Sequence, residues 1–278
     1  MRRRFFSARD GLQLSALEWE GPETALPVLC LPGFSRNALD FADLGARHAG
    51  RRRVIALDYI GHGESARAGL DRYTLPLVIG DVLDCLAALR LPRAVVVGTS
   101  MGGVLGMVLG VLRPGMLAGL VLNDSGPRLD AGGLTGAREM IGNDPGFAQL
   151  DDAAAFMRKL LPETGIPADH WLAAAESSYR QAENGRWYAR WDPALLQALP
   201  KAEAGPTELW DMFQALAAVP LLLLWAQESK VLSAATVLEM RRRKPDLELL
   251  SLPGLEHAPW LGLPAAVARI DAFIGRLG

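Results

Sequence analysis

The feature that most constrains the fold is the alternation of short apolar runs with segments of helical length. Six such runs recur: LPVLCLP, RVIALDY, RAVVVGTS, AGLVLND, VPLLLLWA and LELLSLP. Continuous apolar strands separated by helices are typical of a parallel sheet with helices on both faces. The sequence therefore predicts an α/β fold whose sheet is mostly parallel.

Two stretches depart from this alternation. The N-terminal segment RRFFSARDGLQLSALEW alternates apolar and polar residues on both sides of Asp10-Gly11, which predicts a β-hairpin. Later, about 95 residues separate LVLND from VPLLLL, far more than a simple crossover needs. That interval reads as several helices, so we expect a core formed by residues 1–127 and 212–278, with residues 128–211 as an inserted helical lid.

Composition limits the classes of partner. The formal net charge is −2 and 22% of the 278 residues are charged, so no bulk field attracts nucleic acid or an anionic membrane. No segment has the ~18 consecutive apolar residues of a membrane span. Two cysteines give neither a disulfide framework nor metal-ligand spacing. We expect a cytoplasmic protein with a small-molecule substrate and no cofactor or metal; a homodimer is compatible with the sequence.

The sharpest motif is VVVGTSMGG, in which Gly98 to Gly102 form G-x-S-x-G. It directly follows an apolar run and opens a helical segment, so the chain must turn sharply from strand to helix. Such a turn lifts the serine hydroxyl clear of the sheet, and the helix N-terminus favours the negative charge that develops nearby. The motif predicts Ser100 as a nucleophile.

A second motif, LPGF, ends the first long apolar run at Phe34. In an acyl-transfer enzyme of this layout, backbone N–H groups at this place stabilise the oxyanion. The sequence predicts that the N–H groups of Phe34 and Met101 form an oxyanion hole. A general base is also required. Of the four histidines, only His257 follows the last strand at the sheet edge that carries Ser100, so we expect it to accept the serine proton.

The motifs LPGF, DYIGHGES, GTSMGG and GLEHAPW occur in the order typical of the α/β-hydrolase fold superfamily, which the chain resembles over nearly its whole length. The resemblance implies an eight-stranded sheet and a Ser-His-acid triad. One departure is Leu31, where many members carry histidine. Because the oxyanion donors are backbone groups, we expect this change to be tolerated.

In many members the acid follows the seventh strand, where this chain reads QESKVLS with Lys230 in place of an aspartate. A lysine cannot accept the imidazole N–H or stabilise an imidazolium. Two carboxylates compete for the role. Glu228 lies two residues away, and Asp124 ends the sixth strand, next to the strand of the nucleophile. Some members take their acid from the second place, and we assign Asp124.

A closer resemblance, to (E)-2-(acetamidomethylene)succinate hydrolase-like members, supports Asp124. It rests on the segments ESKVLS, IPADHWLAAAESSY and ND-x-GP. Their dicarboxylate substrate requires cations, whereas the predicted helix 168–179 has no lysine or arginine. We expect an apolar substrate pocket lined by lid tryptophans, namely Trp171, Trp187, Trp191 and Trp210.

These observations predict a serine hydrolase that cleaves a carboxylic ester, or a related acyl bond, of a small and largely apolar substrate through an acyl-enzyme. Three alternatives stay open at this point. The same scaffold supports hydrolysis of a C–C bond in a ring-fission product and of an amide or enamine. A ligand-binding protein that kept the fold and lost turnover is the alternative outside enzymes.

Overall fold

One eight-stranded sheet organises the structure, a computed structural model that describes residues 1–130, 135–161, 163–199 and 207–278. The strand order is β1-β2-β4-β3-β5-β6-β11-β12. Only the pairs β1–β2 and β2–β4 are antiparallel, and the other neighbours run parallel. The strands are β1 (Arg2–Ser7), β2 (Gln13–Trp19), β3 (Val28–Leu31), β4 (Val54–Asp58), β5 (Ala94–Thr99), β6 (Leu117–Asn123), β11 (Leu221–Ala226) and β12 (Glu248–Leu252). The predicted α/β-hydrolase fold, with its N-terminal hairpin, is confirmed.

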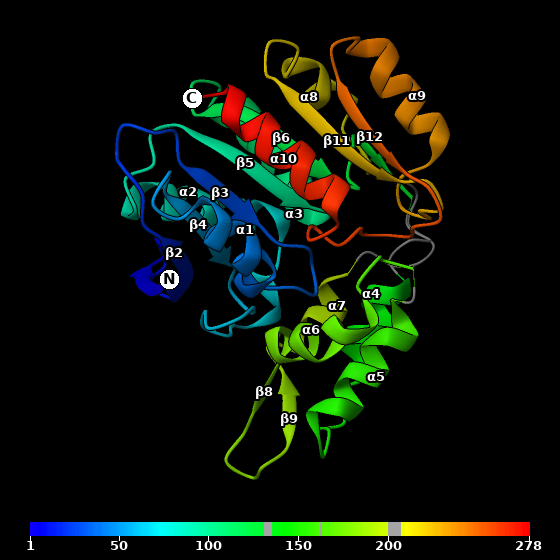
Figure 1. Ribbon diagram of the computed structural model, residues 1–278. Helices are drawn as coiled ribbons and strands as arrows, with labels where there is room; N and C mark the ends of the chain where they lie inside the picture. Colours follow the sequence, from blue (N-terminus) through cyan, green and yellow to red (C-terminus); the bar gives the residue numbers. More distant parts are fainter. Residues whose placement is uncertain (131–134, 162, 200–206) are drawn as a thin grey trace.

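Helices cover both faces of this sheet (Figure 1). The central strands are buried along their whole length, as in β6, where all seven residues are buried. Burial on both faces explains why their sequences are continuously apolar rather than alternating. The helices α1 (Ala42–His48) and α10 (Pro264–Arg276) pack on one face. The opposite face is covered by α2 (Leu75–Ala88), α3 (Met101–Leu112), α8 (Trp210–Ala215) and α9 (Ala234–Arg243).

Most of the interval between β6 and β11 extends beyond one end of the sheet, at the bottom of Figure 1, whereas its last helix, α8, lies near β11 at the top. This interval packs through a hydrophobic cluster in which Met157, Tyr179 and Trp191 are buried together with Leu14 and Ile60 of the core. Its other elements are β7 (Arg128–Leu129), α4 (Thr135–Gly142), α5 (Leu150–Leu160), η4 (Ala168–His170), α6 (Trp171–Ser178), β8 (Tyr179–Gln181), β9 (Trp187–Ala189), α7 (Leu195–Ala198) and β10 (Thr207–Glu208). We propose that it acts as a lid, and below we use this name for the described residues from 128 to 208.

Two details differ from the purely helical lid that the sequence predicts. The strands β8 and β9 form an antiparallel hairpin that was not expected. The expected boundary at Asp211 falls inside α8, whose Phe213 packs in the core cluster next to the sheet. We therefore place the end of the lid before Leu209, after the point where β10 pairs with β7. Within the described ranges, no helix is long and apolar enough to span a membrane.

Candidate active site

Ser100 occupies a sharp turn between β5 and α3. Its backbone has φ 52° and ψ −114°, a conformation that costs a non-glycine residue free energy and is typical of functional sites. The glycines on either side make this turn sterically feasible. A Cβ on Gly102 would lie 1.9 Å from the carbonyl oxygen of Leu31, and one on Gly98 would lie 2.4 Å from the backbone of Gly102. The motif thus brings the serine to the end of the sheet because no side chain blocks the turn.

Ser100, His257 and Asp124 form a continuous chain of hydrogen-bond contacts. The Nε2 atom of His257 lies 2.9 Å from Oγ of Ser100, and its Nδ1 atom lies 2.7 Å from Oδ2 of Asp124. Asp124 is fully buried, whereas 21% of the His257 side chain is exposed. The structure therefore brings together the three residues that the sequence selected as nucleophile, base and acid. The contacts place a proton acceptor beside the serine hydroxyl, with a carboxylate on the far side of the imidazole.

Backbone groups of the neighbouring strand hold the Asp124 carboxylate in place. The N–H of Ala226, at the end of β11, donates to Oδ1 of Asp124 over 3.1 Å. The N–H of Asp124 donates in turn to the carbonyl oxygen of Leu224 over 2.8 Å. Asp124 itself has φ 49°, a left-handed conformation that aspartate tolerates better than most residues. These contacts orient Oδ2 toward His257.

The residue before the acid ties the His257 loop to β6. The side-chain amide of Asn123 donates to the carbonyl oxygen of Pro259 over 2.9 Å and to Oγ1 of Thr99 over 3.2 Å. The carbonyl oxygen of Asn123 accepts from the N–H of Ser100 over 3.0 Å. Asn123 is 1% exposed, so these bonds form away from water. One residue thus links the loops that carry Ser100 and His257.

The side chains of the loop after β11 make other contacts than with the imidazole of His257. Glu228 is exposed, and only its backbone N–H bonds to the protein among the described residues. Lys230 is 77% exposed and lies 3.7 Å from the carboxylate of Glu256. The Oγ atom of Ser229 accepts from the N–H groups of Val231 and Leu232, which closes the turn. The loop contributes no side chain to the contacts of His257.

The predicted oxyanion donors lie beside Ser100. A Cβ built on Gly33 would be 3.7 Å from Cβ of Ser100, which places the Gly33-Phe34 peptide next to the nucleophile. Met101 is the first residue of α3, where N–H groups have no partner within the helix. In the part of the chain that the structure describes, neither the Phe34 N–H nor the Met101 N–H donates to another protein group. Both remain available to a bound oxygen atom.

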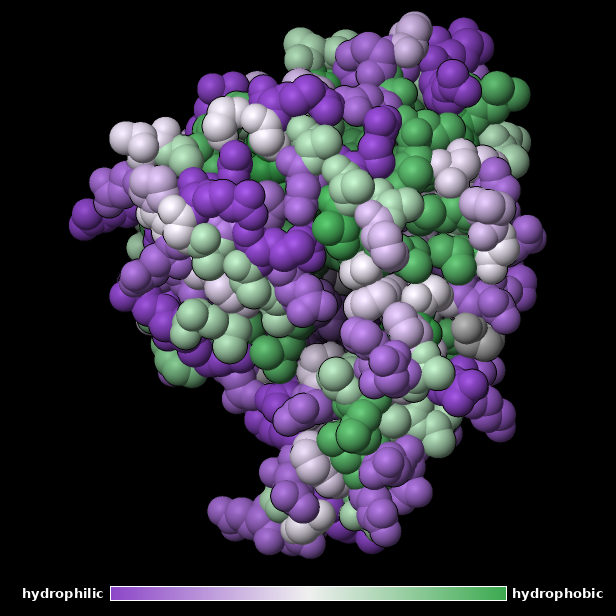
Figure 2. Space-filling view, in the orientation of Figure 1, coloured by the Kyte–Doolittle hydropathy of each residue, from purple (hydrophilic) through white to green (hydrophobic). Residues whose placement is uncertain are grey.

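A cavity of about 570 Å³ opens above these residues, between the sheet and the lid. Figure 2 shows this region as a hollow near the centre of the molecule. Two arginines line it, and both are paired with carboxylates. Arg36 binds both oxygens of Asp40 at 2.6 Å, and Arg190 lies 2.6 Å from Glu64. In the described lining, neither guanidinium is left as a free cation for an anionic ligand.

The prediction that four lid tryptophans line the pocket is wrong, because none of them borders this cavity. Trp171 and Trp191 are buried in the hydrophobic cluster of the lid, and Trp187 packs against the same cluster. Trp210 belongs to the core cluster and lies under the guanidinium of Arg243, 4.3 Å from its carbon atom. All four are packing residues.

The helical period of α6 explains this error. Trp171 and Ala175 are four residues apart, so they share the face that is buried in the lid. Ala173, Ala174 and Ser177 lie on another face and border the cavity. The sequence shows that this helix has two faces, but it does not show which face packs in the hydrophobic cluster and which borders the cavity.

Besides Phe34, an aromatic residue that does line the cavity is Trp260, which the sequence reasoning missed. Its ring centroid lies 5.1 Å from that of His170, at the start of the lid helix α6. Its backbone N–H donates to the carbonyl oxygen of Thr164 over 2.8 Å, which fastens the lid to the His257 loop. Trp260 follows His257 by three residues, and this closeness in sequence is the signal that could have identified it as a cavity residue.

The geometry agrees with comparisons to known proteins. A model of the alpha/beta hydrolase family matches residues 28–270. The chain belongs to the alpha/beta hydrolase family. It is similar to the 3-hydroxybutyrate-oligomer hydrolase of Cupriavidus necator, with 29% identity over 92% of this chain and 90% of that protein. It is also similar to the 2-(acetamidomethylene)succinate hydrolase of Mesorhizobium japonicum, with 26% identity over 88% of each chain.

Among solved structures, an alpha/beta hydrolase from Novosphingobium aromaticivorans superimposes on this family member with a TM-score of 0.92. The two share 34% identity, and the match covers 99% of this chain and 98% of that one. The resemblance to the family, and to (E)-2-(acetamidomethylene)succinate hydrolase-like members, is thus confirmed. The two relatives described above are hydrolases named for different substrates, so the bond cleaved here has to be inferred from the site.

Proposed function

We propose that this hydrolase cleaves the carboxylic ester of a small, uncharged substrate through an acyl-enzyme on Ser100. The observation that carries the proposal is the continuous set of contacts from Ser100 through His257 to Asp124 at the base of a cavity. A serine hydroxyl is a weak nucleophile until a base removes its proton. The imidazole is placed to do so.

In the proposed mechanism His257 accepts the Ser100 proton as Oγ attacks the ester carbonyl carbon. The N–H groups of Phe34 and Met101 stabilise the negative charge on the carbonyl oxygen, and Asp124 stabilises the imidazolium. The C–O bond to the leaving alcohol then breaks as His257 returns the proton to that oxygen. Water, deprotonated by the same imidazole, then attacks the acyl carbon. His257 returns that proton to Oγ of Ser100 as the acyl C–Oγ bond breaks, which releases the acid and free Ser100.

The charge of the lining supports an uncharged substrate. A carboxylate that enters the cavity loses hydration, and this cost is recovered only if a free cation binds it. Arg36 and Arg190 already have carboxylate partners. Apolar side chains such as Met140, Ile166 and Trp260 border the same space, and covering an acyl chain with them contributes about 25 cal/mol per Å². The similarity to an ester-oligomer hydrolase supports an ester over an amide.

The proposal is tested with a fluorophosphonate and a panel of p-nitrophenyl esters of increasing acyl length. We expect the wild-type protein to be labelled and to hydrolyse the esters, and Ser100→Ala to do neither. A neutral ester should also have a higher kcat/KM than an analogue of similar size that carries a carboxylate. Persistent labelling of Ser100→Ala would contradict the nucleophile, and a strong preference for the anionic analogue would contradict the substrate class.

An amide or enamine substrate is the second candidate, because the chain is similar to a 2-(acetamidomethylene)succinate hydrolase. The same assay should therefore include an anilide and a ring-fission diketone beside the esters. Turnover of either with a higher kcat/KM than the best ester would reassign the bond and leave Ser100 as nucleophile. A protein that binds esters but neither turns them over nor reacts with the fluorophosphonate would be a ligand-binding protein instead.

A further inference from the structure

The turn that follows β4 holds the loop of the proposed oxyanion hole from behind. Two rings of this turn are buried, Tyr59 at 0% exposure and His62 at 2%. The hydroxyl of Tyr59 donates to the carbonyl oxygen of Pro32 over 3.1 Å. The Nε2 atom of His62 lies 2.5 Å from the carbonyl oxygen of Phe34. Both polar atoms are directed at the same short loop, although the two segments lie far apart in the sequence.

These two contacts lie on either side of the peptide whose N–H is the proposed oxyanion donor. The N–H of Phe34 belongs to the peptide between Gly33 and Phe34. The carbonyl of the peptide before it is bonded to Tyr59, and the carbonyl of the peptide after it is bonded to His62. Glycine permits a wide range of backbone angles, so Gly33 alone does not fix the direction of this N–H. The two hydrogen bonds do, because they hold the peptides on both sides.

The surroundings of Tyr59 and His62 favour the uncharged form of each ring, which can still donate a hydrogen bond. Burial raises the pKa of Tyr59 well above its ordinary value, so its hydroxyl keeps its proton. Burial also lowers the pKa of His62, although the carbonyl oxygens of Phe34 and Ile60, and to a smaller extent Asp58 and Asp192, oppose this effect. A neutral imidazole carries one N–H, and the shorter contact assigns it to Nε2, since Nδ1 lies 3.1 Å from the Ile60 carbonyl oxygen. The rings pack edge to face, with centroids 5.6 Å apart.

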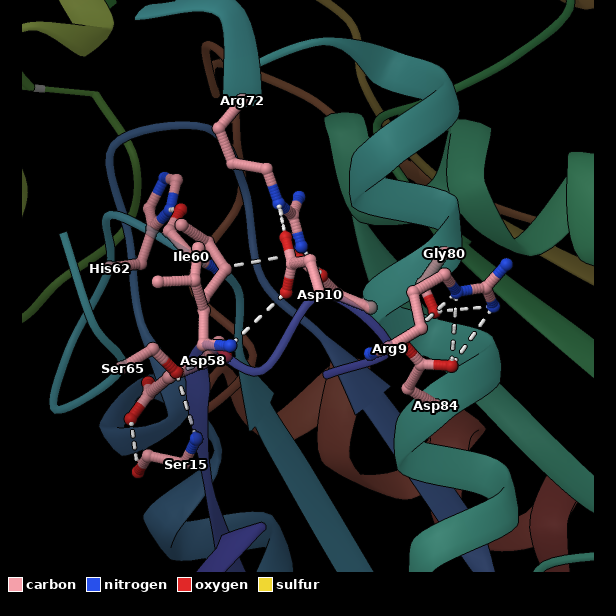
Figure 3. A network of polar contacts seen from close by, with 12 residues as sticks. Arg9, Asp10, Ser15, Asp58, Ile60, His62, Ser65, Arg72, Gly80 and Asp84 are labelled. Atoms are coloured by element: carbon pink, nitrogen blue, oxygen red, sulfur yellow. Dashed lines mark hydrogen bonds and ion pairs between the residues drawn. The ribbon is translucent and has the colours of Figure 1, made fainter. Parts of the chain in front are cut away.

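The turn is itself held by its neighbours, as Figure 3 shows. The hydroxyl of Ser65 donates to the carbonyl oxygen of Asp58 over 2.6 Å and accepts from the N–H of Ser15 over 2.8 Å. The N–H of Ile60 donates to the buried carboxylate of Asp81 over 3.3 Å. Tyr59 and His62 therefore project from a fixed segment, and they can transmit its position to the loop.

We propose that Tyr59 and His62 are positioning residues that orient the Phe34 N–H toward the developing oxyanion. The inference rests on the proposed function, because it deepens the account of the same site. Neither ring is required to touch the substrate. Their effect falls on the transition state, in which the oxyanion forms, and much less on the ground-state complex. Loss of either hydrogen bond should consequently lower kcat and leave KM nearly unchanged.

The test uses Tyr59→Phe, His62→Leu and His62→Gln, with kcat and KM measured on the best p-nitrophenyl ester. Loss of a whole oxyanion donor costs about 10² to 10³ in kcat, so misalignment should cost less, roughly fivefold to fiftyfold in Tyr59→Phe and His62→Leu. The amide of His62→Gln can reach the same carbonyl and should restore most of the rate. Tyr73→Phe is the matched control, because its hydroxyl bonds to Asp192 instead of the oxyanion loop.

A second readout separates orientation from general damage. A trifluoromethyl ketone with the same acyl chain forms a tetrahedral oxyanion on the serine, whereas the corresponding methyl ether is a ground-state ligand. We expect the inhibition constant of the ketone to rise by the factor by which kcat falls, and that of the ether to stay within about twofold. Thermal melts identify a variant that does not fold. If His62→Leu does not fold, the test rests on Tyr59→Phe, which removes only one oxygen atom.

The outcomes distinguish the two proposals. If the wild-type protein hydrolyses no ester and no reagent labels Ser100, the proposed function is overturned and the positioning role with it. If the wild type is active but folded Tyr59→Phe behaves like Tyr73→Phe in kcat and ketone inhibition, the positioning role alone is overturned. An equal rise in KM and in the inhibition constant of the ether would also contradict it, because that result indicates a distorted cavity.

Discussion

The loops that follow β6 and β11 lie at the same end of neighbouring parallel strands, yet they contribute different chemical groups to the site. The loop after β6 directs a fully buried carboxylate, Asp124, at the imidazole of His257. The loop after β11 exposes Glu228 and Lys230 to solvent, and it is the last residue of β11 itself, Ala226, whose backbone N–H donates to the same carboxylate. The proposed acid thus depends on both strands, one for the side chain and the other for its support.

This difference indicates that a carboxylate could reach the histidine from more than one strand at this end of the sheet. Parallel neighbours end side by side, so a carboxylate from either strand can approach a histidine loop that descends between them. In this chain the register pairs Leu224 with Asn123, which sets Asp124 opposite the end of β11. A lysine after β11 is then acceptable, because that position makes no contact with the base.

The largest expected effect comes from Asp124→Asn. The amide preserves the shape but cannot stabilise the imidazolium, so kcat should fall by roughly 10³ to 10⁴, the scale seen when a triad acid becomes an amide. Steady-state kinetics on the best ester measure the loss, and a melting temperature near that of the wild type shows that chemistry and not stability has changed. An active Asp124→Asn protein beside an inactive Glu228→Gln protein would reverse the comparison of the two loops.

A smaller effect should follow Asn123→Ala. This change removes the bonds from the Asn123 amide to the Pro259 and Thr99 oxygens and leaves a buried carbonyl unpaired. With the His257 loop less firmly held, we expect kcat to fall by about tenfold to thirtyfold, on the scale of one lost hydrogen bond. An unchanged kcat would show that Asp124 alone orients the base.

The loop after β11 gives the matching control. Glu228→Gln and Lys230→Ala should each reduce kcat by on the order of tenfold or less, because neither side chain touches the imidazole. The Lys230–Glu256 pair is exposed, and such pairs contribute only about 0–1 kcal/mol to stability, so the melting temperature should barely move. A large loss of kcat in the folded Glu228→Gln protein would mean that the acid lies on the loop after β11 and that our assignment of Asp124 is wrong.

Part of this site was predictable from the sequence because its signals are local. The elbow at Ser100 and the loop of His257 each show their chemistry within a few residues. Asp124 was assigned from its position one helix and one strand onward together with the resemblance to family members that take their acid from that place. The pocket aromatics were not predictable, since the helical period fixes which residues share a face but not what that face meets. His62 was not among the predicted site residues, because its contact with Phe34 crosses 28 residues (62 − 34) that no local pattern connects.

The smallest expected effect is on stability and concerns His62 in the turn after β4, a third loop beside those after β6 and β11. Burial lowers the pKa of His62 in the folded protein, so the folded state binds its proton less readily than the unfolded chain. The free energy of unfolding should therefore be highest above about pH 6.5 and fall as the pH drops below it, by at most about 1.4 kcal/mol per pH unit from this residue.

Urea denaturation at several pH values checks this sign. The His62→Gln protein should lose less stability between pH 7 and pH 5 than the wild type does, although buried His48, whose pKa burial also lowers, keeps part of the slope. His170→Gln is the control, because 48% of that side chain is exposed. Parallel curves for the wild type and His62→Gln would mean that the ring keeps an ordinary pKa, in conflict with its burial.

The position of the acid has a consequence for how such an enzyme can diversify. Ser100 and Asp124 lie within one strand–helix–strand unit, 24 residues apart (124 − 100), and the whole lid comes after both. Insertions in connecting segments cost little free energy, since loop-closure entropy grows slowly with length. The lid can therefore be lengthened, trimmed or exchanged without changing the stretch of chain that joins nucleophile and acid. Of the three proposed catalytic residues only His257 lies downstream, so the proposed catalytic centre and the proposed lid form nearly separate modules for evolution and for engineering.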